Sequence, residues 1–310
     1  MTFSEQIKHK ALELGFDACG ICRATDSEQE AHYMDWLANE CQAGMSYMER
    51  NIEKRLDPRL LVDGAKSIIS VALNYYPHKL QNSDAPKFAY YAYGQDYHDI
   101  VKGKLKLLFD FIKESYPDAT GRYFSDSAPV LERFWAAQAG LGFVGKNTLL
   151  IIPGKGSYFF LGELIIDIDL DYDSPISTTC GRCTKCLDAC PTGAIEAPHR
   201  VNAQKCISYQ TIENKGDIAP EIIPNLSNNI YGCDICQLVC PWNRFANPHN
   251  TPEFNPTEEF LSLDIKKLLD MDEETYREVF RKSAVKRAKY SGLKRNLKAL
   301  LEGKENMKKE

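Results

Sequence analysis

Hydrophobic and polar positions in the first 175 residues follow two different spacings. Apolar residues at helical spacing predict helices over residues 4–14, 27–41, 97–114 and 129–139. Runs rich in β-branched and aromatic residues predict strands over residues 16–23, 67–75 and 122–125. Helices and strands that alternate in this way predict a mixed α/β domain over residues 1–175.

The pattern changes twice in the remainder of the chain. Two β-rich runs on either side of the turn 153–156, Pro-Gly-Lys-Gly, predict a hairpin of two strands. After Pro256, the stretches FLSLDIKKLLD and EETYREVFRK have helical periodicity and predict short helices. A cysteine-rich segment lies between these regions, so we expect a second domain over residues 176–250 and a helical segment over residues 251–310.

Length and composition are those of an intracellular globular protein. A chain of 310 residues fits about two domains of roughly 150 residues, and a hydrophobic content of 44% is sufficient for a buried core. The first residues, MTFSEQIKHKALELGFD, contain neither a signal-peptide core nor twin arginines. No run approaches the roughly 18 apolar residues of a membrane span. We therefore expect a cytoplasmic protein without membrane contact.

Charge is distributed unevenly along the chain. The net charge is −5, yet residues 281–310 contain eleven Lys and Arg against three Glu, so this segment carries +8 and the rest carries −13. Clustered cations release counterions from phosphates on binding, which favours a polyanion as partner. On charge alone, a solvated helix face remains the simpler interpretation.

Eight of the eleven cysteines form one pattern. A run C-x2-C-x2-C-x3-C-P is followed by an isolated cysteine and then by a run C-x2-C-x3-C-P. The first run is the bacterial ferredoxin motif, in which three thiolates hold one 4Fe-4S cluster and the fourth reaches across to the other cluster. The second run lacks one thiolate, which the isolated cysteine supplies. The sequence therefore predicts two 4Fe-4S clusters that relay single electrons.

The crossing rule also assigns each thiolate to a cluster. Zinc sites usually have two separated C-x2-C pairs, and disulfides belong to secreted proteins, so both alternatives are disfavoured. The first cluster receives Cys180, Cys183, Cys186 and Cys240, and the second receives Cys190, Cys206, Cys233 and Cys236.

Residues 140–145 satisfy G-x-G-x-x-G, and with Lys146 they nearly complete a P-loop, except that Asn147 replaces the residue that holds magnesium. Both nucleotide motifs need a strand before the glycines and a helix after them. Here an apolar-periodic helix precedes the glycines and a β-run follows. We therefore expect a tight loop that a ligand or another backbone approaches closely, and not a nucleotide site.

Two further features, a C-x2-C pair and an aspartate, each have a structural explanation as well as a functional one. Cys19 and Cys22 form a C-x2-C pair inside a predicted strand, so packing in the core is favoured over a dithiol site, and Cys41 on a predicted helix is interpreted in the same way. Asp126 lies between a strand and a helix, just before Pro129. It either caps that helix or, if partly buried beside a cofactor, acts as a general acid, and these residues alone do not decide.

Several blocks occur in order along nearly the whole chain. They include EKRLDPRLLVDGAKSIISVALNYY from Glu53, DSAPVLERFWAAQAGLGFVGKNTLLI from Asp126, CGRCTKCLDACPTGAI from Cys180, YGCDICQLVCPWN from Tyr231 and SAVKRAKYSGLKRN from Ser283. Together these blocks resemble the epoxyqueuosine reductase family. The resemblance implies a cobalamin-dependent enzyme with two 4Fe-4S clusters, which reduces the epoxide of epoxyqueuosine at the wobble position of tRNA to the alkene of queuosine.

The family resemblance implies a fold and a site as well. The expected fold is an N-terminal corrinoid-binding α/β (α+β) domain resembling the nitroreductase-like fold, then a two-cluster bacterial ferredoxin-like domain and short C-terminal helices. Asp126 matches the proton donor to the opening epoxide oxygen. The D-x-H-x-x-G corrinoid module is absent, because it begins at Asp96 and His98 but has Val101 in place of glycine. Candidate cobalamin contacts are Arg55, Asp126, Gly145, Lys146, Asn147, Thr148, Ser157, Tyr209 and Glu213.

Longer family members continue into helical repeats that help to grip RNA, whereas this chain stops soon after Asn296. We therefore expect the anticodon stem-loop of tRNA to contact the basic C-terminal helices, and we expect an external low-potential electron donor and a monomer. The candidate RNA contacts are Lys286, Arg287, Lys289, Lys294 and Arg295.

Two other functions stay open at this point. A corrinoid reductive dehalogenase has the same cofactor and clusters, although typical members resemble exported proteins with a twin-arginine leader. A non-catalytic ferredoxin-type electron-transfer protein would not need an α/β region of about 175 residues with its own site. Halide release would identify the first, and lack of corrinoid binding would identify the second.

Overall fold

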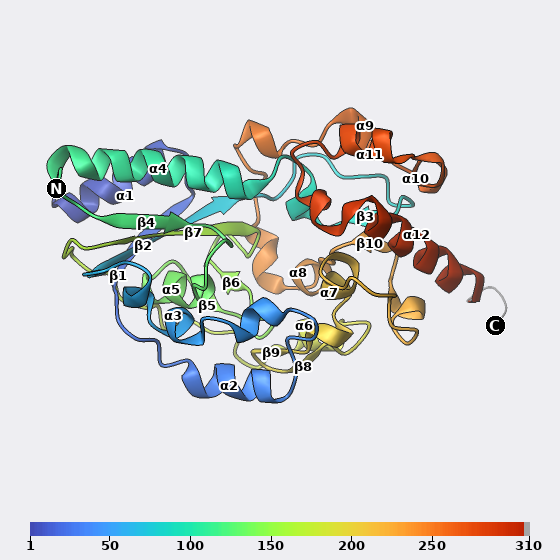
Figure 1. Ribbon diagram of the computed structural model, residues 1–310, viewed down its shortest axis with the longest axis horizontal. Coiled ribbons are helices and arrows are strands. Elements are labelled where there is room, and N and C mark those ends of the chain that lie inside the picture. Colours follow the sequence, from blue (N-terminus) through green and yellow to red (C-terminus); the bar gives the residue numbers. More distant parts are fainter. Residues whose placement is uncertain (307–310) are drawn as a thin grey trace.

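The computed structural model describes residues 1–306, in which helices and short strands alternate (Figure 1). The helices are α1 Phe3–Glu13, α2 Glu30–Ala38, α3 Ile52–Leu56, α4 Tyr97–Ser115, α5 Glu132–Gln138, α6 Lys185–Asp188, α7 Ile207–Ile212, α8 Ile235–Leu238, α9 Glu258–Leu261, α10 Ile265–Asp270, α11 Glu273–Val279 and α12 Lys289–Asn306. The strands are β1 Ala18–Arg23, β2 Ser67–Asn74, β3 Lys87–Phe88, β4 Gly121–Phe124, β5 Phe143–Val144, β6 Leu150–Ile151, β7 Phe159–Ile166, β8 Ile195–Ala197, β9 Arg200–Val201 and β10 Asn229–Tyr231.

A four-stranded sheet organises the N-terminal region. Its strand order is β1-β2-β7-β4, and every neighbouring pair is antiparallel. All eight residues of β2 are buried, because this strand lies inside the sheet and both of its faces are covered. The predicted mixed fold is confirmed, and the antiparallel pairing makes it an α+β arrangement.

Helices cover both faces of this sheet. Alternate side chains of β2 point to opposite faces, so Ile69 and Val71 pack on one side with α1 and α4, while Ile68 and Ala72 pack on the other side with Trp135 of α5. Figure 1 shows α1 and α4 above the sheet and α5 below it. The hydrophobic effect on both faces fixes the sheet between two layers.

The predicted hairpin after Asn147 is wrong in its pairing. The turn forms, with an isolated bridge between Ile152 and Gly156, but β6 pairs with β5 and β7 pairs with β2 and β4. The reason is burial: seven of the eight β7 residues are buried, and an apolar strand of this kind is most stable inside the larger sheet. A Cβ at Gly142 would lie 2.2 Å from the Ile151 carbonyl oxygen, so the expected close backbone approach at this glycine loop is present.

The cysteine-rich region and the C-terminal helices form the other end of the molecule (Figure 1). Here β3 pairs in parallel with β10, although they are more than a hundred residues apart in the chain. Phe88 of β3 packs with Phe260, Tyr276 and Leu297 of the C-terminal helices. The segment around β3 therefore contacts the C-terminal core, although it precedes residue 175 in the sequence. Among residues 1–306, no helix is both long and apolar enough to cross a membrane.

Asn296 connects α12 to the cysteine-rich region and provides a test of this packing. Its side chain is fully buried, and Nδ2 donates to the carbonyl oxygens of Thr211 (2.7 Å) and Ile230 (2.9 Å). Asn296→Ala leaves both carbonyls buried without a donor, so we expect the free energy of unfolding to fall by about 2–4 kcal/mol. Denaturant unfolding of the anaerobic protein measures this loss. The exposed neighbour Lys298→Ala is the control and should be nearly neutral.

Candidate functional site

The seven cysteines of the two runs lie on and around α6 and α8, and the isolated Cys206 directly precedes α7. All eight are half-buried free thiols. Burial and the charge of the Cys180 and Cys240 thiols raise the pKa of Cys186. Burial and the thiols of Cys206 and Cys190 likewise raise the pKa of Cys233 to about 12. A thiol influences a pKa in this way only at short range, so Cys240 lies near Cys186, and Cys190 lies near Cys233. Burial raises the pKa of Cys236, and the charges of Cys233, Cys206 and Cys186 add to this shift, so the two cysteine groups also lie close to each other.

The surroundings of the two cysteine groups differ in exposure. Gly181, Arg182 and Lys185, which flank the first run, are exposed. Ile207 and Asp234, which flank Cys206 and Cys233, are buried. The group around Cys206 and Cys233 therefore lies deeper in the protein than the group around Cys183.

A buried polar network joins α8 to the N-terminal sheet. Gln237, which follows Cys236, donates through Nε2 to the carbonyl oxygen (3.1 Å) and Oγ (3.2 Å) of Ser157 and to the Tyr75 hydroxyl (3.2 Å). Asn243 accepts from the Ser157 backbone N–H at 2.7 Å and donates through Nδ2 to Ser157 Oγ at 3.0 Å. Buried polar groups that satisfy one another have a defined geometry, so this junction fixes the deeper cysteine group against the sheet.

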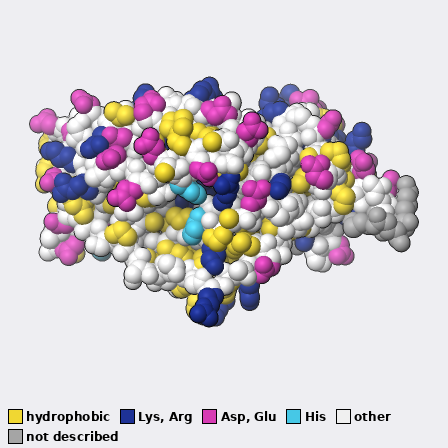
Figure 2. All heavy atoms as spheres, turned by 90° about the horizontal axis from the view of Figure 1, so that it is seen from below, with side chains coloured by type: hydrophobic (Ala, Val, Ile, Leu, Met, Phe, Trp, Pro, Cys, Tyr) yellow, Lys and Arg dark blue, Asp and Glu magenta, His cyan; other side chains and the backbone are white. Residues whose placement is uncertain are grey.

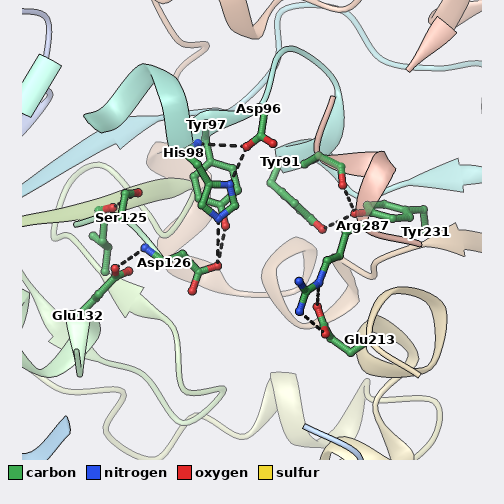
Figure 3. Close-up of polar contacts among 12 residues, drawn as sticks. Tyr91, Asp96, Tyr97, His98, Ser125, Asp126, Glu132, Glu213, Tyr231 and Arg287 are labelled. Carbon is green, nitrogen blue, oxygen red and sulfur yellow. Dashed lines mark hydrogen bonds and ion pairs between the residues drawn. The ribbon is translucent and has the colours of Figure 1, made fainter. Parts of the chain in front are cut away.

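Asp126 lies just beyond the end of β4, in a left-handed backbone conformation (φ +49°). Its Oδ2 accepts a hydrogen bond from the Tyr97 hydroxyl (2.6 Å) and lies 3.9 Å from His98 Nε2. On the other side of the imidazole, Nδ1 lies 2.6 Å from Asp96 Oδ1 (Figure 3). Burial raises the pKa of Asp96, but hydrogen bonds from His98 outweigh it and leave this pKa below its usual value.

The alternative role of Asp126 as a helix cap is wrong. Helix α5 begins at Glu132, its N-cap is Leu131, and no side chain caps it. Asp126 instead has a positive φ, and its N–H donates to the carboxylate of Glu132, the first residue of α5. The Asp126 side chain is 69% exposed in the protein alone, so the expected partial burial would need a bound ligand or RNA.

Glu213 and Arg287 face Asp126 across the same space (Figure 3). Arg287 Nε and Nη2 each donate to a Glu213 carboxylate oxygen at 2.8 Å. Burial raises the pKa of the Tyr47 phenol to about 12, and the negative charges of Glu213 and Asp126 add to this shift. A single phenol that responds to both carboxylates shows that the end of α7 and the end of β4 line one site.

Two of the candidate cobalamin contacts carry buried donors without partners. Within residues 1–306, neither Arg55 Nε nor Asn147 Nδ2 meets an acceptor. Buried donors are rarely left unpaired, so these atoms are suited to the phosphate or amide oxygens of a bound ligand. Glu213 faces the same space through the ion pair with Arg287, and a ligand there would compete with that pair.

Other candidate cofactor residues are engaged within the protein. Lys146 Nζ donates to the carbonyl oxygens of Gly181 (2.8 Å) and Cys183 (2.9 Å), so it supports the first cysteine run. Tyr209 accepts from the Gly44 N–H at 2.8 Å. Ser157 belongs to the polar network at α8. Gly145 accommodates Ile151, while Thr148 has a positive φ and accepts from Arg133 through its carbonyl oxygen at 2.7 Å.

The candidate RNA contacts divide into two sets. Lys294 donates to the carbonyl oxygens of Leu268 and Leu269, Arg295 donates to those of Asn214 and Gln210, and Arg287 is paired with Glu213. Lys286 and Lys289 are exposed. On the face in Figure 2, Lys and Arg are interspersed with Asp and Glu, so no cationic stripe covers it. Lys308 and Lys309, counted in the basic segment, lie outside the described residues.

Cys19 and Cys22 do not form a dithiol site. Cys19 packs with the core on the α1 side of the sheet and Cys22 with the core on the α5 side, because residues three apart in a strand point to opposite faces. Burial raises the pKa of each thiol to about 12. Their interpretation as core residues is supported by this geometry.

Several residues of the site are not evident from the sequence. The sequence places Tyr97 only in a predicted helix, and His98 only in an incomplete corrinoid module. The available signal was Asp96, because an Asp that caps a helix leaves the next two side chains near the same helix end. Tyr47 and Glu132 carry no local signal, since their role depends on residues that are brought to them only by the fold.

The two cysteine runs lie against an α+β domain, and the Asp126 carboxyl group faces the end of α7. These features together define an iron-sulfur redox protein. Residues 179–243 match the model of the 4Fe-4S double cluster binding domain. Residues 55–127 match the model described as epoxyqueuosine reductase QueG, DUF1730. The chain is 51% identical over 295 residues to the epoxyqueuosine reductase of Cellulophaga algicola, covering 95% of this chain and 96% of the relative. It is 40% identical to that of Escherichia coli, covering 96% of this chain and 80% of the relative. The chain belongs to the epoxyqueuosine reductase family.

Solved structures agree with this assignment. The epoxyqueuosine reductase of Streptococcus thermophilus has a TM-score of 0.89 at 32% identity, with 98% of this chain and 82% of that chain covered. One with an epoxyqueuosine-modified tRNA stem loop has a TM-score of 0.85 at 36% identity, covering 96% and 80%. In the Bacillus subtilis enzyme, with a TM-score of 0.86, 36% identity and the same coverage, the catalytic aspartate loop is swung out of the active site. A catabolic reductive dehalogenase at 17% identity has a TM-score of 0.50 over 96% of this chain and 36% of its own, which shows a common fold alone.

The raised thiol pKa values of the strand cysteines give a prediction. At pH 8, Cys19 and Cys22 stay protonated in the folded protein because their pKa values are about 12. We expect iodoacetamide to leave both unmodified in the folded protein and to alkylate both in urea. Peptide mass spectrometry distinguishes the two states. Rapid modification of either residue in the folded protein would contradict their placement in the core.

Proposed function

We propose that this protein reduces epoxyqueuosine in tRNA to queuosine. The observation that carries the proposal is the position of Asp126, which faces the end of α7 while Cys206, in the deeper cysteine group, lies at the start of that helix. The proposed proton donor and the proposed source of electrons therefore border the same site. The family relationship supplies the substrate class, since related enzymes bear this activity in their names and one is solved with an epoxyqueuosine-modified stem loop.

The eight thiolates are proposed to hold two 4Fe-4S clusters in the crossed arrangement. Cys180, Cys183 and Cys186 with Cys240 would hold the cluster nearer the surface, and Cys190, Cys206, Cys233 and Cys236 would hold the deeper one. The neighbours of Cys240 and Cys190 described above support this assignment. Electrons would enter from an external low-potential donor at the exposed cluster and leave through the deeper cluster towards Asp126.

Cobalamin is the proposed second cofactor. The unpaired buried donors of Arg55 and Asn147 fit its phosphate and amide groups, and Glu213 with Tyr209 would line the opposite wall. When bound, the group supplies electrons to the substrate at its cobalt. We also propose that the N-terminal domain, which would bind this cofactor, has a nitroreductase-like fold.

The chemistry at the substrate requires two protons. Reduction breaks both C–O bonds of the epoxide, forms the C=C bond with two electrons and releases the oxygen as water. Asp126 would protonate the oxygen first, as a general acid within reach of the substrate. His98, 3.9 Å from Asp126 Oδ2 and held by Asp96, would then return a proton to Asp126 for the second transfer.

The substrate base, epoxyqueuosine, is proposed to reach the site as part of a tRNA stem-loop. Lys286 and Lys289 are exposed beside Arg287, whose ion pair with Glu213 borders the site. Phosphates near these cations would release counterions, so binding should weaken as salt rises. Lys294 and Arg295 support the site by holding α12 on neighbouring carbonyl oxygens.

Reconstitution tests the proposed function. Protein loaded anaerobically with iron, sulfide and cobalamin should convert epoxyqueuosine-containing tRNA to queuosine with a low-potential reductant, as measured by nucleoside mass spectrometry. Asp126→Asn should lose about 10²–10⁴-fold in rate, because the amide donates no acidic proton. Iron and corrinoid contents serve as controls for loading. Lack of product from fully loaded wild-type protein would refute the proposal, and full activity of Asp126→Asn would refute only the role of this residue.

The proposed proton return predicts the effect of two substitutions on turnover. His98 donates to Asp96 and lowers the pKa of this carboxyl group below its usual value, so the Asp96 carboxylate holds the imidazole through Nδ1. His98→Gln should lower kcat about 10–100-fold, because an amide returns no proton to Asp126. Asp96→Asn should lower kcat less, because the imidazole remains but loses its charged partner. Turnover of loaded protein measures both effects, and an unchanged kcat in His98→Gln would show that His98 does not return the proton.

A further inference from the structure

The surface over the first cysteine run carries positive charge. Arg182 and Lys185 lie on either side of Cys183 in the sequence, and Arg244 lies four residues after Cys240. All three cationic side chains are exposed. Because these residues lie close in sequence to proposed thiolate ligands of one cluster, their charges lie near the exposed end of the electron path.

Nearby carboxylates do not neutralise these three cations. In the part of the chain that the structure describes, no ion pair engages any of them, and the Arg244 guanidinium instead lies over the Phe245 ring, 4.6 Å from its centre. On β9, by contrast, Arg200 is paired with Asp35 at 2.8 Å. The three cations therefore remain available to a negatively charged partner.

An open depression of about 490 Å³ lies between α6 and α8, which are side by side (Figure 1). Ala189 in its lining directly precedes Cys190, and Val239 directly precedes Cys240. One thiol of each cysteine group is thus adjacent in the sequence to the lining. A partner seated here lies close to both groups, as the transfer of a single electron requires. The lining residues are Lys185, Asp188, Ala189 and Val239.

Exposed apolar side chains extend the same surface. Leu238, next to Val239, is 52% exposed, and Phe245 is 38% exposed. Aromatic residues and Arg are enriched at protein interfaces, whereas interfaces with nucleic acid are more polar. The exposed Asp188 accepts from Thr184 Oγ1 at 2.7 Å and would repel a phosphate. This mixture of cations and apolar side chains favours a protein partner over RNA.

We propose that this surface docks a small acidic protein that carries one low-potential electron. The proposal rests on the proposed function, which requires an external electron donor. Each encounter oxidises the partner by one electron and reduces the exposed cluster by one electron, and no bond to the partner forms. Two encounters supply the two electrons of one epoxide reduction. The docking surface is defined by Arg182, Lys185, Leu238, Arg244 and Phe245.

The overall charge of the chain favours docking at a defined place. The chain carries −5, so an acidic carrier is repelled by the molecule as a whole and attracted where cations are unpaired. Interfaces between electron-transfer proteins are small and short-lived, so a surface of a few residues suffices. Attraction between exposed charges is screened by salt, so docking should weaken as the ionic strength rises.

Binding to a defined acidic carrier tests the proposal without turnover. The probe is a purified flavodoxin of net negative charge, and anaerobic titration calorimetry with cluster-loaded protein measures its Kd at low salt, without tRNA or corrinoid. The double variant Arg182→Glu with Lys185→Glu should raise Kd about tenfold or more, because attraction becomes repulsion. Arg244→Glu alone should raise Kd by a smaller factor. The wild-type Kd should rise with salt.

A control with the same change of charge separates docking from net charge. Lys66 precedes β2 and Lys113 lies in the last turn of α4, and both are exposed at the end of the sheet away from α8 (Figure 1). Lys66→Glu with Lys113→Glu should leave Kd within about twofold of wild type. Iron content is the control for loading. If the double variant at the docking surface loads poorly, Arg182→Gln with Lys185→Gln should still raise Kd about threefold.

Electron transfer gives a second readout. In anaerobic stopped-flow, reduced flavodoxin should reduce the clusters of the Arg182→Glu, Lys185→Glu variant about tenfold more slowly than those of wild type. Photoreduced deazaflavin, a small carrier that needs no docking surface, should reduce both proteins equally fast. A similar slowing with deazaflavin would show a damaged cluster and would overturn the assignment of these cations to docking.

Three results of the binding experiment would overturn the proposal: no binding of flavodoxin to wild type at low salt, equal Kd in wild type and the Arg182→Glu, Lys185→Glu variant, or an equal rise of Kd in the control. Loss of tRNA binding with unchanged flavodoxin binding would assign the surface to RNA and would also overturn it. Because no tRNA product is measured, failure of queuosine formation is distinguishable from failure of docking.

Discussion

The buried polar junction between α8 and the N-terminal sheet is the contact on which the rest of the site depends. Gln237 is one residue from Cys236, and hydrogen bonds to Ser157 and Tyr75 fix its side chain. Because Cys236 directly precedes this residue on the same short helix, the junction fixes the distance between this thiol of the deeper cysteine group and the sheet. The sheet then places Asp126 at the end of β4, and α7 extends from Cys206 towards it.

In the proposed reaction, electrons and protons meet at this site from opposite sides. The cysteine module approaches through α7 and α8. Asp126 and the side chains that contact it come from the loop after β4 and the start of α4 (Figure 3). Asp126 itself is exposed and strained in its backbone, so its position depends on its neighbours: Tyr97 and His98 at the carboxylate, Glu132 at the N–H. This arrangement suits a residue that must meet a large substrate from outside and still have one defined position when it does.

The sequence predicted those features that depend on local pattern. The strand expected at residues 67–75 is β2, and the helix expected at 97–114 is α4, because both have long uninterrupted apolar periodicity. The pairing of β6 with β5, and of β3 with β10, could not be predicted, since strands of two or three residues carry no periodicity. The count of charged residues predicted a basic C-terminal segment. It could not show that Arg295 donates to backbone carbonyl oxygens and is therefore engaged within the protein. Glu163 lies in an apolar run of the sequence, and only the fold shows that its carboxyl group is fully buried.

The central claim is that two iron-sulfur clusters lie side by side, with one of them against the sheet that carries Asp126. Iron analysis with electron paramagnetic resonance of the reduced, anaerobically loaded protein tests it most directly. The account predicts about eight irons per polypeptide and a spectrum split by magnetic interaction between two neighbouring 4Fe-4S clusters. About four irons, or two clusters whose spectra are independent of each other, would contradict it.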